Sequence, residues 1–301
     1  MDWLSGDFKT EGFPPEEAAG GPGLGLADMI AAELCGYDGC MGIYLNDLRG
    51  HVLKLHECEE FETASCCKMF VLSALFDKVE KDEASLSELL PFEERFAING
   101  SGVLSSLELG TELSVLNLAT LMIIMSDNIA TNILIDYVGL DYINDFIHGI
   151  GLRGSMLHNP IDFVKYERLG TVTPSDYGLI WTRLAAGELV SRKASEEMIR
   201  ICRMQHYNTM LTGKLPWYFM DEDNYGQKEH QIIWTASKSG SMDECRNDGG
   251  IVHTPYGEYV IVLLNKDFSD LSYHTDHPAY TYGQAVSRLV FDWYIARRGS
   301  F

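Results

Sequence analysis

The sequence has few positive charges. It holds 23 lysine and arginine residues against 44 aspartate and glutamate residues, which gives a formal net charge of −21. Nucleic acids and anionic membranes repel a chain of this charge, so we expect neither as a partner. A small neutral or cationic ligand is easier to accept than a polyanion, although a local basic site can overcome the net field.

Long hydrophobic runs and cysteine pairs are also missing. The longest apolar run, Leu118–Met125, is too short to span a bilayer, and Met1–Asp7 has neither the basic nor the apolar region of a signal peptide. The seven cysteines are odd in number and form no C-x-x-C pair. We therefore expect reduced thiols and a cytoplasmic location.

The order of helical and strand-like patterns indicates how the chain is organised. Residues 1–26 are rich in glycine, proline and acidic residues, which predicts a flexible N-terminal arm. Periodicity then predicts a series of elements. They are a helix at Leu26–Leu34, strands at Cys40–Leu45 and His51–Leu55, a buried helix at 65–80, helices at Leu113–Met125, Asn128–Tyr137 (with Ser126 as N-cap) and Tyr177–Ala186, strands at Ile232–Lys238, Gly249–Thr254 and Tyr259–Asn265, and a helix at Tyr282–Arg297.

Three short polar motifs follow one another in a fixed order. They are Ser65-Cys66-Cys67-Lys68, Ser126-Asp127-Asn128 and Lys238-Ser239-Gly240. Each alone is ordinary, but the order S-x-x-K, S-D-N, K-[T/S]-G is the pattern of class A β-lactamases and penicillin-binding proteins. Two further segments, Arg246–Val252 and Tyr259–Asn265, resemble the strand pair that follows the third motif in this family. The chain thus resembles a class A β-lactamase-like serine hydrolase over roughly residues 27–298.

The resemblance implies a fold class and a place for the site. The fold class is α/β (α+β): an antiparallel sheet flanked by N- and C-terminal helices, with an inserted all-helical domain. Residues 27–62 and 211–301 would form the sheet domain and residues 63–210 the helical domain, because strands stand at both ends of the chain and helices between them. The active site would lie in the cleft between the two domains.

The first two motifs supply a nucleophile and a base. A serine hydroxyl needs a base, and residues three apart share one helix face, so Ser65 is the expected nucleophile and Lys68 its base. Lysine acts as a base only when neutral, and burial beside a second cation such as Lys238 lowers its pKa. Resemblance implies that Ser126 lies between the lysines and passes a proton to the leaving group, and that Asn128 holds a substrate amide.

The third motif is expected at a strand edge that lines the cleft. Gly240 would let the ligand approach the backbone, with Ser239 and Ser241 beside it. The N–H groups of Ser241 and Ser65 would form an oxyanion hole. Arg246 is a candidate for gripping a substrate carboxylate, and a salt bridge from it to Asp248 or Asp243 is an equally open interpretation.

One element of the family pattern is absent. Class A enzymes carry E-x-x-L-N ahead of the Thr-x-Thr-Pro turn, and its glutamate activates the deacylating water. Here Thr171–Pro174 supplies the turn, but no such segment precedes it; Glu167 and Asp162 are candidates with the wrong spacing. We therefore expect slow deacylation. Residues 215–231 look like an added loop near the cleft.

Several functional interpretations remain open. We expect a metal-independent hydrolase without a cofactor that acts on a small molecule, with β-lactams as the default substrate class. The rivals are an amidase, esterase or transacylase on another acyl substrate, and a binding module acylated without turnover. A metal site at His274 and His277, or a thiol nucleophile at Cys66 or Cys67, is the less favoured interpretation. The oligomeric state stays open.

Overall fold

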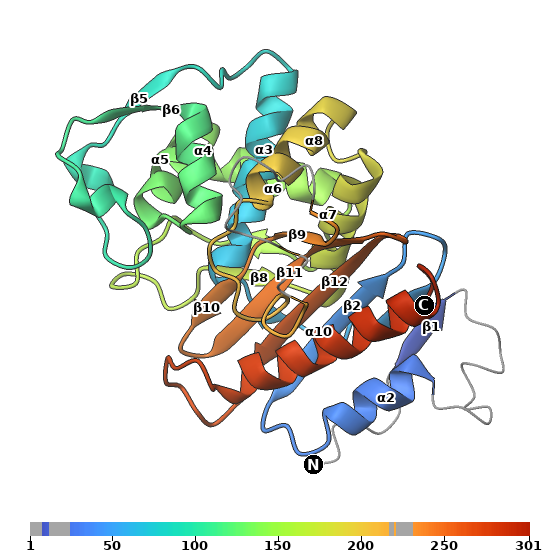
Figure 1. Cartoon of the computed structure of the whole chain (residues 1–301). Coiled ribbons are helices and arrows are strands. Elements are labelled where there is room, and N and C mark those ends of the chain that lie inside the picture. The colour runs from blue at the N-terminus through green and yellow to red at the C-terminus, as the bar shows by residue number, and fades with distance from the viewer. Residues whose placement is uncertain (1–7, 12–24, 217–219, 221–230) are drawn as a thin grey trace.

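The framework of the protein is one seven-stranded antiparallel sheet, ordered β1-β3-β2-β12-β11-β10 with β9 paired to β11 (Figure 1). The computed structural model describes residues 8–11, 25–216, 220 and 231–301. Strands far apart in sequence meet at its centre, where Ile43 of β2 lies opposite Leu263 of β12. The strands are β1 (Lys9–Glu11), β2 (Cys40–Asn46), β3 (Val52–Leu55), β9 (Trp234–Ser237), β10 (Gly240–Met242), β11 (Cys245–Thr254) and β12 (Gly257–Lys266).

Two helices cover one face of this sheet. Figure 1 shows α2 (Leu26–Glu33) and α10 (Pro278–Ala296) lying side by side across the strands. Proline at the first position suits the start of α10, since it has no N–H to leave unsatisfied. The helices and the sheet bury a common core that includes Ile30, Ile43 and Val290.

The helical region lies on the opposite face. Its helix α7 packs directly on β2 and β12, and a Cβ at Gly178 would lie 2.2–2.6 Å from the ring of Tyr44, so only glycine permits this approach. The region contains η1 (Ala64–Cys67), α3 (Lys68–Glu80), η2 (Glu94–Phe96), η3 (Leu104–Ser106), α4 (Val115–Ile124), α5 (Asn128–Val138), α6 (Leu140–Gly149), α7 (Pro174–Ala186), α8 (Arg192–Cys202) and the short strands β4 (Phe61–Glu62), β5 (Leu89–Pro91), β6 (Glu112–Ser114), β7 (Met156–Leu157) and β8 (Gly170–Val172).

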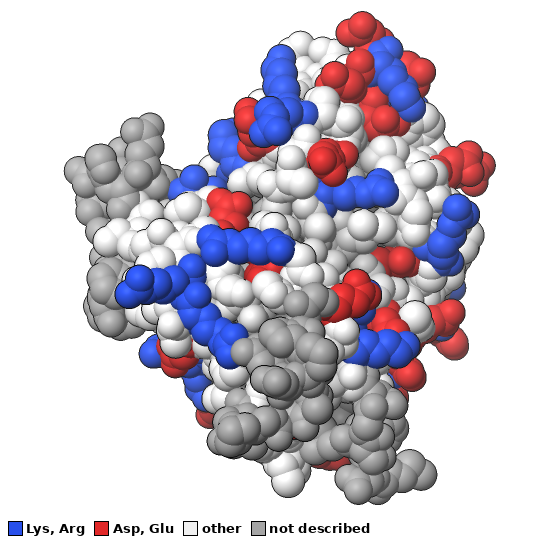
Figure 2. Space-filling model, turned by 90° about the vertical axis from the view of Figure 1, so that its right-hand side faces the viewer, with Lys and Arg blue, Asp and Glu red and all other residues white. Residues whose placement is uncertain are grey.

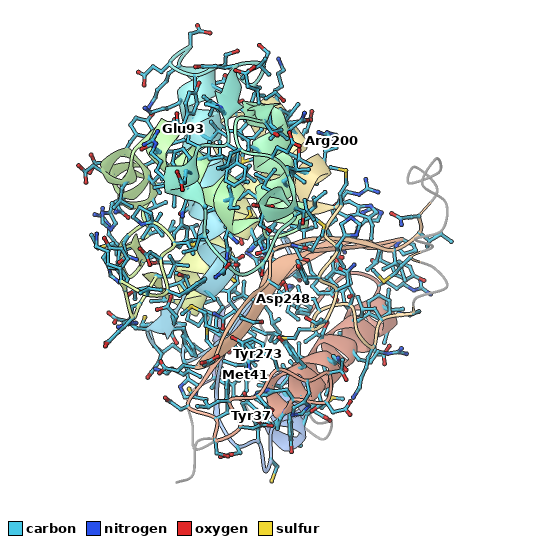
Figure 3. All side chains as sticks on the ribbon, turned by 90° about the vertical axis from the view of Figure 1, so that its left-hand side faces the viewer. Tyr37, Met41, Glu93, Arg200, Asp248 and Tyr273 are labelled. Atoms are coloured by element: carbon cyan, nitrogen blue, oxygen red, sulfur yellow. The ribbon has the colours of Figure 1, made fainter. Side chains whose placement is uncertain are left out.

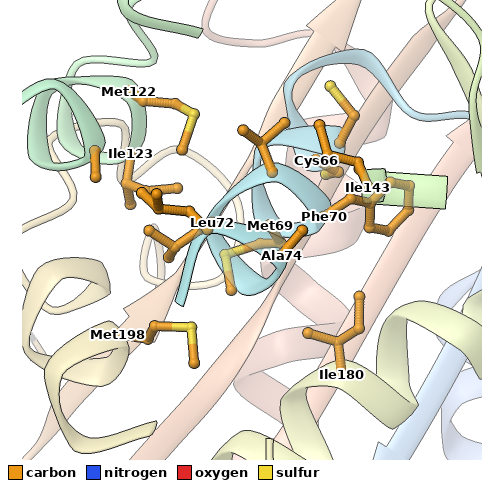
Figure 4. Packing of buried hydrophobic residues seen from close by; sticks show 14 of the residues in the cluster. Cys66, Met69, Phe70, Leu72, Ala74, Met122, Ile123, Ile143, Ile180 and Met198 are labelled. Atoms are coloured by element: carbon orange, nitrogen blue, oxygen red, sulfur yellow. The ribbon is translucent and has the colours of Figure 1, made fainter. Parts of the chain in front are cut away.

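Helix α3 runs through the middle of the helical region. Every residue from Lys68 to Phe76 is buried, as expected from a sequence that is apolar on all sides. Figure 4 shows its side chains surrounded by those of neighbouring helices, among them Met122, Ile143 and Met198. The start of α3 is therefore held rigidly, and that start carries the first polar motif.

The predicted fold class is confirmed, with two local corrections. The flexible arm expected for residues 1–26 is wrong at Lys9–Glu11, which pair with β3; residues 1–7 and 12–24 lie outside the described part. The cap of α5 is Asp127, whose Oδ1 accepts the Ala130 N–H at 3.0 Å, rather than Ser126. Most of the expected 215–231 loop also lies outside the described residues. The assignment of residues 63–210 to a separate domain stays a prediction.

A buried carboxyl group lies where the sheet meets the helical region. Asp248 on β11 is 1% exposed, and Figure 3 shows it between the helical region and α10. The N–H groups of Leu211 and Gly249 donate to its two oxygens at 3.1 and 2.9 Å. Burial nevertheless dominates and raises the pKa of Asp248 to about 7.

This raised pKa predicts a pH-dependent stability. A carboxyl whose pKa is higher in the folded state than its unfolded value near 4 contributes stability that is full below about pH 4. The contribution is lost as the pH rises through about 7, by about 4 kcal/mol at most. Urea unfolding of wild type and Asp248→Asn between pH 4 and 8 should show a difference that changes in this window. If the unfolding free energies of the two proteins differ by the same amount at every pH, the raised pKa of Asp248 is contradicted.

Candidate active site

The nucleophile expected from sequence sits in a tight turn at the start of α3. Ala64, just before Ser65, has a left-handed backbone with φ of 42°. Its N–H donates to Oε1 of Glu62 at 3.3 Å, and the Cys66 N–H donates to the Thr63 carbonyl at 3.0 Å. A non-glycine residue in this conformation costs about 1–3 kcal/mol, which the surrounding structure must offset. The turn points the half-buried Ser65 into a cleft.

Lys68 lies one turn further along and is fully buried. Its Nζ is 3.0 Å from Ser65 Oγ and 2.9 Å from Ser126 Oγ. It also reaches the Ser126 carbonyl at 2.6 Å and Asn128 Oδ1 at 2.9 Å. Burial, and after it the charge of Lys238, lowers the pKa of Lys68 well below the usual lysine value. An amine with a lowered pKa at this distance from Ser65 Oγ can accept a proton from it.

The second motif lies between helices α4 and α5, opposite the nucleophile. Ser126 has a φ of 50°, a second left-handed residue at the site. Asp127 fixes this loop, because its Oδ2 accepts the N–H groups of Val103 and Leu104 at 2.7 and 2.9 Å. Asp127 thus organises the loop, and Thr131 braces it, because its hydroxyl donates to the Asp127 carbonyl at 2.6 Å.

The third motif follows the end of β9. Lys238 is fully buried, and its Nζ donates to the Ser239 carbonyl at 2.6 Å. Tyr177 of α7 donates its hydroxyl to the Lys238 carbonyl at 2.8 Å, which anchors the strand to the helical region. Burial lowers the pKa of Lys238. In the described structure Ser126 Oγ bonds Lys68, and no bond from it to Lys238 is present.

Gly240 makes a close backbone approach, but not the one expected. A Cβ at this position would lie 2.7 Å from the Ser65 nitrogen, 2.8 Å from the Cys66 nitrogen and 2.9 Å from the Thr63 oxygen. The glycine therefore lets β10 pack against residues 63–66, the nucleophile turn that carries Ser65. This contact brings the next residue, Ser241, to the cleft wall beside Ser65.

A cleft of about 660 Å³ opens above Ser65. Its other walls come from the 100–101 loop, the segment 161–169 and the β10–β11 turn. Asn132 of α5 fixes the second wall through two bonds, because its Oδ1 accepts the Ile161 N–H at 2.8 Å and its Nδ2 donates to the Ile161 carbonyl at 2.9 Å. Asn132 thus holds the buried Ile161 in place. The wall that contains Ile161 joins apolar side chains with the carboxylate of Glu167.

Comparison with known proteins agrees with this arrangement. The sequence profile of the beta-lactamase enzyme family matches residues 25–294. The chain belongs to this family.

Individual relatives are distant but extend over most of the chain. A beta-lactamase of Bacteroides uniformis is 25% identical over 278 residues, covering 89% of this chain and 90% of that protein. The structure of a beta-lactamase from Sphaerobacter thermophilus is 27% identical with a TM-score of 0.78, covering 89% of this chain and 96% of that one. The structure of PBP-A, at 24% identity and a TM-score of 0.76, covers 90% of this chain and 96% of that chain and shares the fold.

Arg246 of this beta-lactamase family member is not where a carboxylate ligand was expected. Its side chain is fully buried and donates to the carbonyls of Cys245 and Ser272, both at 2.9 Å, and to that of Met242. The ring of Tyr273 covers the guanidinium at 4.2 Å. Neither a cleft-facing group nor a salt bridge to Asp248 or Asp243 is present in the described contacts. Arg246 instead ties the β10–β11 turn to the 271–273 loop.

The two carboxylates considered for deacylation, Asp162 and Glu167, have different surroundings in the structure. Asp162 accepts the N–H groups of Val164 and Lys165 at 3.1 Å and stays within its own loop. Glu167 is exposed and lines the cleft. Sequence reasoning missed Glu62, which also lines the cleft; its position three residues before Ser65 could have indicated it. It also missed Ile161, because only the fold brings this residue to Asn132.

The two cysteines and two histidines considered as a thiol nucleophile and a metal site have structural contacts instead. Burial raises the pKa of both Cys66 and Cys67 to about 12, so a thiolate is disfavoured at neutral pH. His274 pairs with the carboxylate of Asp270 at 2.9 Å, and His277 bonds the Asp270 carbonyl. Among the described residues, no group of three or more His, Cys, Asp or Glu side chains could hold a metal ion. In the same residues, no helix is long and apolar enough to cross a membrane.

The two buried lysines predict a specific pH profile. Acylation should increase with pH as Lys68 loses its proton, at a pH well below the ordinary lysine pKa. Because the cationic charge of Lys238 lowers that pKa, Lys238→Met should move the rising limb to higher pH. The measurement is the acylation rate of each protein across pH by intact mass spectrometry. A limb that stays in place or moves to lower pH would contradict the coupling.

Proposed function

We propose that this protein is a serine hydrolase that forms an acyl-enzyme at Ser65, with β-lactams as its default substrate class. The observation that carries the proposal is the contact of the fully buried Lys68 Nζ with both Ser65 Oγ and Ser126 Oγ, at 3.0 and 2.9 Å. Ser65 gives its proton to Lys68 and attacks the carbonyl. The hydroxyl of Ser126 then relays a proton to the leaving nitrogen.

The oxyanion would be held by backbone groups. The N–H groups of Ser65 and Ser241 are candidates, since both residues line the cleft and Gly240 keeps β10 in contact with η1. Ser241 Oγ is 2.7 Å from the Tyr280 hydroxyl on α10, which fixes this strand end. One such donor is worth about 10²–10³ in rate. Asn128 and Ser239 remain proposed substrate contacts, and Asn128 also lines the cleft.

An amidase, esterase or transacylase on another acyl substrate is the second candidate, and a module acylated without turnover is the third. The place of Ile161 favours them, because this residue lines the cleft with an apolar side chain and offers no carboxylate to activate water. Turnover of a chromogenic cephalosporin separates the candidates. Steady turnover indicates a lactamase, a burst alone indicates a binding module, and no reaction indicates another acyl donor. Cytoplasmic location stays a prediction.

Ser65 is expected to carry the acyl group. Incubation with penicillin G or a fluorophosphonate should place an adduct on the peptide that contains Ser65, and Ser65→Ala should abolish it. Lys68→Ala should lower the acylation rate by about 10²–10⁴, the usual effect of a general base. Peptide mapping after intact mass spectrometry tests both. An adduct on Cys66 or Cys67, or wild-type acylation by Lys68→Ala, would refute the assignment.

Deacylation is expected to be slow and to respond to position 161. Glu167→Gln should change the adduct lifetime little, whereas Ile161→Glu should shorten it by about 10²–10⁴, because it would add a carboxylate base to the cleft that Ser65 lines. Asn132 binds the backbone of Ile161, so the substitution leaves those bonds available. The matched control is Ile161→Gln, which should behave as wild type. A deacylation rate that falls strongly in Glu167→Gln would identify Glu167 as the base instead.

A further inference from the structure

The cleft above Ser65 has walls of one charge sign. Four carboxylates line it: Glu62 beside the nucleophile turn, Glu167 on the segment before β8, and Asp243 and Glu244 in the β10–β11 turn. Within the part of the chain that the structure describes, no lysine or arginine lines the same cleft. The face in Figure 2, by contrast, carries basic and acidic side chains interspersed.

The carboxylate of Glu62 is largely buried and held by backbone hydrogen bonds, unlike a solvated surface group. Its side chain is 10% exposed, and its Oε1 accepts the N–H groups of Leu169 and Gly170 at 3.2 and 3.1 Å. Its Oε2 is buried and has no hydrogen-bond partner among the described residues. The nearest cation, Arg168 Nε, lies 3.5 Å from this oxygen. A buried carboxylate oxygen with an unused lone pair favours a donor or a positive charge in the cleft.

Each described cation near the cleft is either paired with a carboxylate or fully buried. Arg168 pairs with Glu62. Arg246 is fully buried, donates to backbone carbonyls and lies beneath the ring of Tyr273. Lys68 and Lys238 are also fully buried beneath the floor, and burial lowers the pKa of both. Arg168 is 55% exposed but balances Glu62 alone, and the other three cations are fully buried. The carboxylates of Glu167, Asp243 and Glu244 are therefore left without a cation on the described cleft walls.

The effect of these charges on a bound molecule is measurable. A cleft of about 660 Å³ is roughly 9 Å across, close to one Debye length at physiological salt. At that separation one pair of unit charges changes an equilibrium or rate ratio by about two- to twentyfold, for an effective dielectric constant between 80 and 20. Several carboxylates act in the same direction.

We propose that the cleft selects acyl substrates whose acyl portion carries a positive charge, such as a protonated amine, and disfavours those with an added carboxylate. This inference rests on acylation at Ser65, the proposed function. Phe163 adds to the selection, because its ring lines the cleft, is 49% exposed and offers a π-face to an ammonium group. A neutral side chain should fall between the two charged classes.

Three penicillins test the proposal with one scaffold. Ampicillin, penicillin G and carbenicillin share the bicyclic ring and its carboxylate, and differ at one side-chain carbon that bears an ammonium group, a hydrogen or a carboxylate. The second-order acylation rate at Ser65 should decrease in that order, by about two- to twentyfold per step at low salt. In 1 M salt the differences should shrink, since the Debye length falls to about 3 Å.

Variants separate the wall charges from the intrinsic reactivity of the drugs. Asp243→Asn/Glu244→Gln should reduce the ampicillin-to-carbenicillin rate ratio at least about threefold. The matched control, Asp141→Asn/Asp145→Asn, removes two exposed carboxylates from α6 and should leave the ratio unchanged. Equal ratios in the cleft variant and wild type, or carbenicillin as the fastest compound, would overturn the inference.

Failure of the proposed function would look different. In that case no penicillin would form an adduct at Ser65, whatever its charge. A cationic, neutral and anionic series of p-nitrophenyl esters then tests the charge preference on its own. A preference for the cationic ester that the cleft variant weakens would support the inference, and a flat series would refute it.

Discussion

The burial of the Lys68 amine is the constraint on which the site depends. An ammonium group taken out of water loses several kcal/mol of hydration, and proteins usually avoid this cost by pairing or neutralising it. Here the amine sits on a helix that is apolar on all sides, with a second buried lysine acting on it. Its close partners are hydroxyl, carbonyl and amide oxygens rather than a carboxylate. The neutral form is therefore favoured, and a neutral amine is a base.

Backbone strain and close packing hold the other groups around this amine. Ala64 and Ser126 both adopt left-handed conformations. Ala64 precedes Ser65, and Ser126 itself carries the second hydroxyl that Lys68 contacts. Gly240 lets β10 press on the nucleophile turn at a distance that no side chain would permit. Each of these features costs stability locally, and the buried core around α3 offsets it. The geometry is thus a property of the packed helical region and sheet together.

The site combines two electrostatic environments. Beneath the floor, two lysines are desolvated and their pKa values are lowered. On the walls, carboxylates line the space that a substrate would fill, together with the apolar side chain of Ile161. Two desolvated lysines suit formation of an acyl bond, whereas the apolar side chain that Asn132 holds at position 161 cannot activate water for its cleavage. This division is the physical basis for expecting fast acylation and slow release.

The sequence by itself determined the order of elements and the chemistry-bearing residues. Apolar periodicity predicted α3 and the strands β2, β3, β9, β11 and β12, since local patterns depend only on neighbouring residues. The three motifs indicated Ser65, Lys68, Ser126 and Lys238 as candidate site residues. The tertiary structure alone decided what lies between distant segments. It buried Arg246 under Tyr273, paired Lys9–Glu11 with β3 and fixed Ile161 through Asn132. These outcomes depend on long-range packing, for which a side chain's local sequence carries no signal.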